Sequence, residues 1–135
     1  MLRNGILHPE LIRQLALCGH GDKLLIADAN YPLDQESGNA VKIYLGLRRG
    51  LPSVTQVLES ILWAVNVEKA EVMEPGDGSK PAVFADFASL LDGCPLEKLS
   101  RSAFYQAGAD IKVRVAVATG EERVFANILL TIGTV

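Results

Sequence analysis

Four consecutive apolar residues, Leu24–Ala27, limit what this chain can fold into more than any other part of the sequence. A strand with one face in water alternates apolar and polar residues, whereas an unbroken apolar run indicates a strand buried on both faces. Strands of that kind are typical of parallel sheets that helices cover on both sides. The sequence therefore predicts a strand over residues 23–28 that belongs to such a sheet.

Segments with helical periodicity alternate with short strand-like segments along the rest of the chain. Predicted helices cover residues 9–18, 54–65, 82–92 and 101–107. Further predicted strands cover residues 41–45, 67–73, 113–117 and 124–132, and residues 74–81 form a loop. The alternation predicts an α/β fold with a mainly parallel central sheet flanked by helices. We expect residues 1–135 to form one such layered domain, because this length suits a single domain.

The composition argues against several classes of protein. The formal net charge of −3 is unfavourable for a nucleic-acid partner, since phosphate binding needs a surplus of Lys and Arg. No apolar segment approaches the roughly 20 residues that span a bilayer, and the N-terminus lacks the apolar core of a secretory signal. Cys18 and Cys94 lack metal-ligand spacing and are expected to be free, buried thiols in a reducing compartment. We therefore expect a cytoplasmic protein with no nucleic-acid or membrane partner.

Histidine is scarce, and one of the two histidines has an unusual setting. His8 precedes Pro9 and is expected to begin the helix that follows. His20 lies between two glycines, where side-chain bulk is minimal and the backbone can take unusual angles. A loop histidine of this kind is either structural or catalytic, and the local pattern leaves both readings open. The chain contains no P-loop, GxSxG, HExxH or GxGxxG motif, which removes several large enzyme classes.

Three other polar residues occur at positions where a ligand could be held. Asp28 ends the buried strand, and the crevice at the carboxyl ends of strands is the usual ligand site of open α/β sheets. Its carboxylate can orient ligand hydroxyl groups, or it can accept hydrogen bonds from loop N–H groups. Arg101 opens a predicted helix and is either solvated or ligand-binding. Asn127 lies within an apolar run, so its amide needs a partner, either backbone or ligand.

Taken together, these residues resemble the D-ribose pyranase / L-fucose mutarotase family over almost the whole chain. The resemblance rests on an ordered set of segments: GHGD at 19–22, the strand that ends in Asp28 and Ala29 before Pro32, the pair Arg101 and Phe104, and ANILL from Ala126, preceded by Phe125. Members of the family move free sugars between ring forms or anomers without any cofactor. The resemblance therefore implies an isomerase that acts on a monosaccharide and needs no cofactor and no metal ion.

The resemblance also implies roles for individual residues. His20 corresponds to the catalytic histidine of the family, whereas Asp28 and Asn127 correspond to its sugar-binding carboxylate and amide. Arg101 stands where ribose pyranases carry a histidine and fucose mutarotases carry an arginine. The chain is therefore more similar to the L-fucose mutarotase branch.

Phe125 departs from the family pattern, which usually has a tyrosine at this position. The phenylalanine keeps a ring that can pack on the face of a sugar, so it stays among the expected substrate-binding residues. It lacks the hydroxyl group, however, and Tyr105 and Tyr31 are candidates to supply one.

The expected chemistry is ring opening by acid–base catalysis. Mutarotation removes a proton from the anomeric hydroxyl and delivers one to the ring oxygen, and histidine titrates near neutral pH. His20 and Asp28 lie at opposite ends of the predicted strand, up to roughly 26 Å apart when the chain is extended. The site must therefore be folded back by the loop 19–22 or shared between subunits. The resemblance favours sharing, because family members form ring-like homo-oligomers, with a decamer as one expected size, and have sites near subunit contacts.

Three functions remain open at this point. The first is a mutarotase that acts on L-fucose or a similar aldose. The second is a pyranase that acts on D-ribose or another pentose, against which Arg101 argues. The third is a non-catalytic sugar-binding or regulatory module that has kept the fold, which Phe125 favours.

Overall fold

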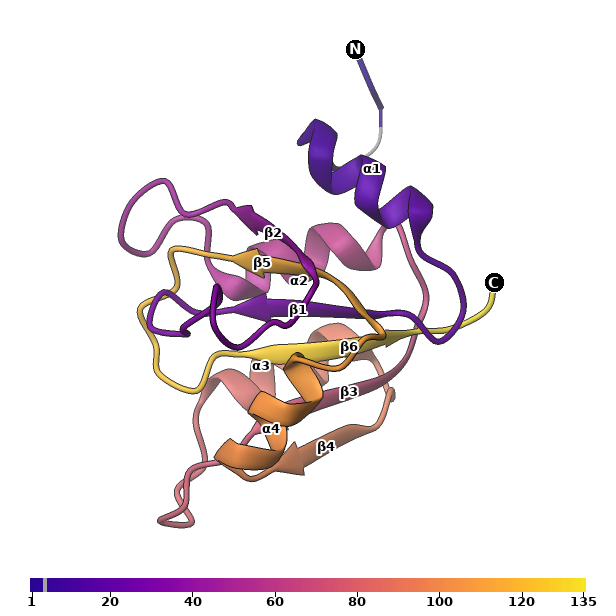
Figure 1. Cartoon of the computed structure of the whole chain (residues 1–135). Helices are drawn as coiled ribbons and strands as arrows, with labels where there is room; N and C mark the ends of the chain where they lie inside the picture. The colour runs from indigo at the N-terminus through magenta and orange to yellow at the C-terminus, as the bar shows by residue number, and fades with distance from the viewer. Residues whose placement is uncertain (4) are drawn as a thin grey trace.

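The computed structural model describes residues 1–3 and 5–135, and within them six strands form a single sheet with helices on both faces (Figure 1). The helices are α1 (Pro9–Leu17), α2 (Val54–Leu62), α3 (Val83–Leu91) and α4 (Arg101–Gly108). The strands are β1 (Lys23–Ala27), β2 (Val41–Tyr44), β3 (Val67–Met73), β4 (Leu96–Leu99), β5 (Val113–Ala118) and β6 (Ile128–Ile132). The predicted α/β fold with a mainly parallel, helix-flanked sheet is confirmed.

The direction of the strands defines two different edges of the sheet. The strand order is β2-β5-β1-β6-β3-β4, with parallel pairing of β2 with β5, β5 with β1, and β3 with β4. Strand β6 lies between β1 and β3 and is antiparallel to both. Strands β1 to β5 therefore end at one edge, here called the carboxyl edge, where β6 begins. The opposite edge, where β1 to β5 begin and β6 ends, is called the amino edge.

Strand β1 is buried on both faces, as its unbroken apolar run predicts. Leu24 and Ile26 pack into a core that α1, α2 and α3 cover, whereas Leu25 and Ala27 pack into a core on the other face. That second core contains Phe104 of α4 and the segment around Tyr31 and Leu33. All four residues of the run, Leu24–Ala27, are fully buried.

The helices α1, α2 and α4 begin where the sequence predicts, because side chains satisfy their free N–H groups, that of Ser100 in the case of α4. His8 caps α1, and its Nδ1 accepts a hydrogen bond from the Leu11 N–H at 3.1 Å. Ser53 caps α2 in a reciprocal capping box with Gln56. His8 thus has the helix-entry role expected of it.

The structure departs from the sequence predictions in three places. Strand β4 was not predicted, and the strand predicted over 124–132 begins only at Ile128. Cys18 and Cys94 are free, but they are half-buried rather than buried, and burial raises the pKa of both thiols. As to a membrane, none of the described helices combines the length and apolar character needed to cross one.

Candidate functional site

Four of the predicted site residues come together in a pocket of about 250 Å³ at the carboxyl edge. Asp28 follows β1, Arg101 opens the helix after β4, and Phe125 and Asn127 precede β6. These side chains come from three separate segments of the sequence and meet because β1, β4 and β6 place their neighbouring loops at the same edge. The pocket is lined by Asp28, Asn30, Tyr31, Met73, Arg101, Tyr105, Val124, Phe125 and Asn127.

Asp28 is a buried carboxylate, 3% exposed, that is held by loop N–H groups. Its Oδ1 accepts a hydrogen bond from the Asn30 N–H at 2.9 Å, and its Oδ2 accepts one from the Ala126 N–H at 3.2 Å. Burial raises the pKa of Asp28, although these two N–H groups act in the opposite direction. The carboxylate thus has the structural role that sequence reasoning left open, and it also lines the pocket.

Asn127 is also buried, 4% exposed, and links the start of β6 to the end of β1. Its Oδ1 accepts a hydrogen bond from the Asp28 N–H at 2.8 Å. The Asn127 side chain also acts to lower the pKa of Asp28 through a hydrogen bond, so its amide NH₂ lies near the Asp28 carboxylate, and the side chain lines the pocket. An amide NH₂ carries two hydrogens, so one N–H of Asn127 remains to donate to a ligand.

Arg101 and Phe125 form one wall of the pocket. The Arg101 guanidinium carbon lies 5.8 Å from the centroid of the Phe125 ring, which is the geometry of a cation–π contact. Phe125 has a φ of 59°, in the left-handed region that side-chain-bearing residues seldom adopt. Backbone strain of this kind is found most often where a structure fixes a ligand-binding group.

Tyr105 is a pocket residue that the expected substrate-binding set did not contain. It follows Arg101 by one helical turn, so the two side chains share a face of α4, and this i, i+4 spacing was the available signal. The Tyr31 hydroxyl donates to the Glu36 carbonyl oxygen at 3.1 Å. The Tyr105 hydroxyl has no such bond with any described residue, so Tyr105 is the better placed of the two candidate hydroxyl donors.

His20 lies at the opposite edge of the sheet from the pocket. Its Nε2 is 3.1 Å from Oε2 of Glu68, at the start of β3, and both side chains are about half exposed, at 60% and 47%. Gly21, at a φ of 86°, turns the chain there, and its N–H donates to the Ile132 carbonyl oxygen at the end of β6. Strand β1 spans roughly 17 Å between His20 and Asp28, so the loop 19–22 does not fold the histidine back onto the pocket of its own chain.

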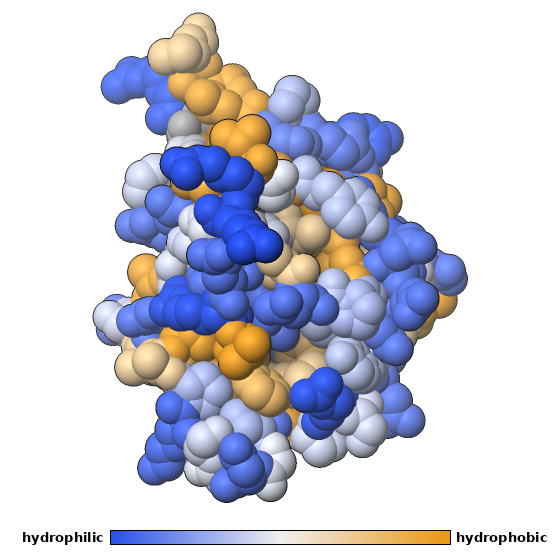
Figure 2. Space-filling view, turned by 90° about the vertical axis from the view of Figure 1, so that its left-hand side faces the viewer, coloured by the Kyte–Doolittle hydropathy of each residue, from blue (hydrophilic) through white to orange (hydrophobic). Residues whose placement is uncertain are grey.

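The pocket offers groups suited to a small polyhydroxylated molecule. A buried carboxylate accepts hydrogen bonds, the Asn127 NH₂ and Arg101 donate them, and aromatic rings provide faces on which the C–H side of a sugar can pack. Figure 2, which faces the carboxyl edge, shows apolar surface broken into separate patches between polar side chains. Among the described residues, no three His, Cys, Asp or Glu side chains are grouped so that they could hold a metal ion.

Comparison with known proteins shows that this chain is similar to one protein family over its whole length. The model of the RbsD / FucU transport protein family matches residues 1–135. A D-ribose pyranase of Laribacter hongkongensis is 32% identical over 135 residues, which cover 100% of this chain and 99% of the relative. A D-ribose pyranase of Streptomyces coelicolor is 37% identical over 144 residues, with 98% of each protein covered.

Two solved structures have the same fold over the whole chain. Bacillus subtilis RbsD in complex with D-ribose has a TM-score of 0.88 and 30% identity, with 100% of this chain and 99% of that chain covered. The fucose mutarotase of Streptococcus pneumoniae in complex with L-fucose has a TM-score of 0.85 and 27% identity, with the same coverage. Both of these similar proteins bind a monosaccharide.

Proposed function

Because the chain belongs to the RbsD / FucU transport protein family, we propose that it interconverts the anomers or ring forms of a free monosaccharide. The observation that carries this proposal is the pocket at the carboxyl edge, where Asp28, Arg101, Phe125 and Asn127 meet. A cation at the first position of a helix is electrostatically unfavourable, so the place of Arg101 at the start of α4 favours a role in the pocket.

The proposed reaction opens and recloses the sugar ring. A base removes the proton of the anomeric hydroxyl while an acid gives a proton to the ring oxygen, and the bond between C1 and that oxygen breaks to leave an aldehyde. Rotation about the bond to C1 and reversal of the two proton transfers then close the ring in either configuration. His20 is the proposed proton carrier, and positioned acid–base catalysis of this kind contributes on the order of 10²–10⁴-fold.

We propose that each complete site contains residues of two chains. The pocket and His20 lie at opposite edges of the same sheet, so one chain cannot bring both to one sugar. A second copy whose amino edge meets the carboxyl edge of the first would supply the imidazole, as in a ring-like homo-oligomer. Within each chain, the Glu68 carboxylate would orient that imidazole through its Nε2.

The leading substrate is L-fucose or a similar aldose, and the second candidate is D-ribose. Arg101, at the position where the resemblance associates an arginine with fucose mutarotases, favours the first. The names of the D-ribose pyranases that are 32% and 37% identical, and the D-ribose bound to the similar Bacillus subtilis protein, favour the second.

Anomeric-exchange NMR with L-fucose, D-ribose, L-rhamnose and D-galactose tests the proposal. Accelerated exchange of one or more of these sugars supports an enzyme, and the fastest sugar identifies the branch. Binding without acceleration would instead identify a non-catalytic sugar-binding module. A folded His20→Ala variant that exchanges sugar as fast as the unmodified protein would rule out the proposed proton carrier.

A further inference from the structure

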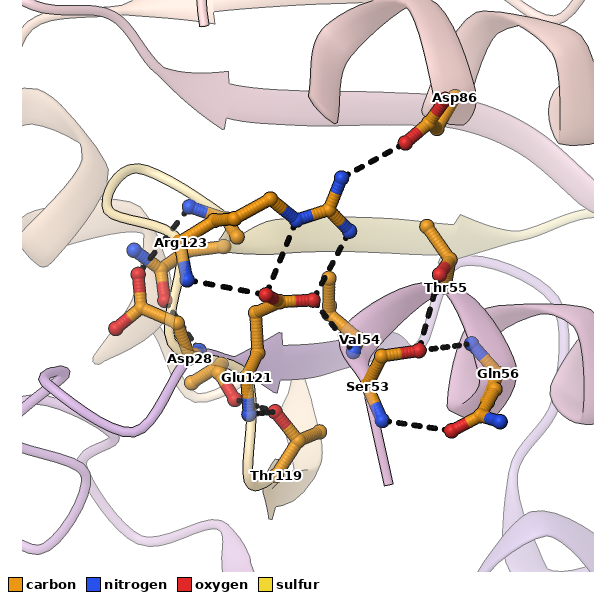
Figure 3. Close-up of polar contacts among 12 residues, drawn as sticks. Asp28, Ser53, Val54, Thr55, Gln56, Asp86, Thr119, Glu121 and Arg123 are labelled. Carbon is orange, nitrogen blue, oxygen red and sulfur yellow. Dashed lines mark hydrogen bonds and ion pairs between the residues drawn. The ribbon is translucent and has the colours of Figure 1, made fainter. Parts of the chain in front are cut away.

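The loop that joins β5 to β6, residues 119–127, contains an ion pair that the proposed reaction does not use. The carboxylate of Glu121 is buried, with the side chain 6% exposed. The Arg123 guanidinium forms a bidentate ion pair with this carboxylate: Nε donates to Oε1 at 3.0 Å and Nη2 donates to Oε2 at 3.0 Å (Figure 3). The Arg123 backbone N–H donates to the same Oε1, also at 3.0 Å. The guanidinium and the backbone of one residue are thus fixed to one carboxylate.

This ion pair is attached to the rest of the fold on three sides. Oε2 of Glu121 also accepts from the Val54 N–H at the start of α2 at 3.3 Å, and the Glu121 carbonyl oxygen accepts from the Ala29 N–H after β1 at 2.9 Å. Nη1 of Arg123 donates to Asp86 of α3 at 2.8 Å. Burial alone would raise the pKa of Glu121, but the hydrogen bonds and charge of Arg123 hold that pKa below its ordinary value.

The beginning of the loop is fixed as well. Thr119 donates to the Ala27 carbonyl oxygen through both its N–H and its hydroxyl, at 3.0 and 2.8 Å. Gly120 follows, and a Cβ there would clash with the Arg48 carbonyl oxygen, so only glycine fits against that neighbouring turn. The first half of the loop is therefore held in a fixed conformation at the carboxyl edge.

The second half of the loop carries the pocket residues. After Arg123, the next backbone group with a fixed partner is the Ala126 N–H, which donates to Asp28. Only Val124 and Phe125 lie between these two anchors, and Phe125 is the residue in the left-handed conformation. A phenylalanine keeps such a conformation only where the surrounding structure leaves the chain no alternative.

We infer that Arg123 is a positioning residue of the sugar pocket, because its bidentate bond to Glu121 fixes one end of the segment 124–127. That segment holds Phe125 against Arg101, and it holds Asn127 beside Asp28. This inference rests on the proposed function for its catalytic consequence, but its structural part concerns the pocket without sugar. Arg123 itself does not line the 250 Å³ pocket. Its effect would pass through Phe125, Ala126 and Asn127.

The first test is amide hydrogen exchange of the sugar-free Arg123→Ala variant. We expect protection of the Ala126 and Asp28 amides, which join the loop to the end of β1, to fall by about tenfold, while amides in the centres of β1 and β5 change by less than about twofold. Unchanged protection at Ala126 and Asp28 would overturn the inference. A uniform loss across the sheet would also overturn it, because that result reports lost stability and not lost positioning.

The second test is anomeric-exchange kinetics of the same variant with the fastest sugar of the panel. Since a misplacement of about 1 Å can cost on the order of 100-fold, we expect kcat/KM to fall by about 10- to 100-fold, with most of the loss in KM. The matched control is Arg13→Ala, an exposed arginine on α1, which is expected to leave the rate unchanged. A folded Arg123→Ala variant with unaltered KM and kcat would overturn the inference.

Two results separate this inference from the proposed function. If the unmodified protein accelerates no sugar, the proposed function fails, and the hydrogen-exchange comparison alone decides the role of Arg123. If Arg123→Ala does not fold, Arg123→Lys replaces it and is judged by the same criteria, because lysine keeps the charge but cannot form the bidentate bond to Glu121.

Discussion

Asp28 and Glu121 are both buried carboxylates of the carboxyl edge, yet their pKa values move in opposite directions. Burial raises the pKa of Asp28, whose hydrogen-bond donors among the described residues are neutral N–H groups. Glu121 is also buried, but the Arg123 guanidinium more than compensates and lowers its pKa. The sequence identified Asp28 by its place at the end of a buried strand. It gave no comparable signal for Arg123, because a loop arginine has no special meaning until its loop is folded against α2 and α3.

The raised pKa of Asp28 predicts a pH-dependent contribution to stability. At a pH between the unfolded and the folded pKa, the folded protein holds a proton on Asp28 that the unfolded chain has released. This contribution is therefore complete below the unfolded pKa and is lost as pH rises through the folded pKa. We expect the unfolding free energy of the unmodified protein minus that of Asp28→Asn to decrease between about pH 3 and about pH 7. Urea denaturation of both proteins across this range measures the difference, and an increase with pH would contradict the assignment.

The free hydroxyl of Tyr105 predicts a role in sugar binding. Tyr105→Phe removes one oxygen atom and keeps the ring, so the loss should equal that of one hydrogen bond, about 2- to 10-fold in KM for the preferred sugar. Tyr44→Phe, which removes an exposed hydroxyl from β2 outside the pocket, is the control. Exchange kinetics that are equal for the two variants would exclude Tyr105 from the site.

Among the helices and strands, the sequence predicted those whose structure is determined by their own residues. It missed those whose structure depends on contacts with neighbouring segments. The boundaries of β3 agree with prediction because Val67–Met73 alternates inside turn signals. Strand β4 has four residues, none fully buried, and pairs with β3 alone at the end of the sheet, so its LEKL sequence carries little pattern. The segment 124–127 is apolar enough for a strand, but the hydrogen bonds of Ala126 and Asn127 with Asp28 keep it out of the sheet.

The capping box of α2 predicts a measurable loss when its serine is removed. Ser53→Ala deletes the hydroxyl that accepts from the Gln56 N–H, and it should lower the free energy of unfolding by about 1 kcal/mol. Ser60→Ala, in the same helix but away from its start, should change it by less than about 0.5 kcal/mol. Chemical denaturation of the two variants provides the comparison, and equal losses would show that the cap contributes nothing.

For the whole molecule, the central fact is that the two halves of the predicted site lie at opposite edges of one sheet. The sequence could place His20 and Asp28 at opposite ends of β1, because a strand separates them in the chain. It could not show whether the loop 19–22 folds back, since that depends on the contacts of Gly21 and His20 with Ile132 and Glu68. The structure excludes the folded-back alternative, and the shared site remains a prediction.

A shared site predicts complementation between two inactive variants. His20→Ala and Asp28→Asn should each abolish most of the exchange activity when purified alone. Mixed oligomers, formed by unfolding and refolding the two together, should regain about a quarter of the activity, because in random assembly about a quarter of the sites receive both intact residues. Activity that stays at the level of the separate variants, in mixtures confirmed to contain both chains, would contradict a shared site.

The path of β6 has a practical consequence for anyone who expresses this protein. Because this strand runs toward the amino edge, its last residues lie beside Asp22 and Glu68: the Ile132 N–H donates to the Asp22 carbonyl oxygen, and a Cβ at Gly133 would lie 3.1 Å from that of Glu68. Residues appended after Val135 would leave the molecule on the side of the amino edge, where Glu68 pairs with His20, and would crowd whatever approaches that edge (Figure 1). Purification handles for kinetic work belong instead at the N-terminus, or they should be cleaved before assay.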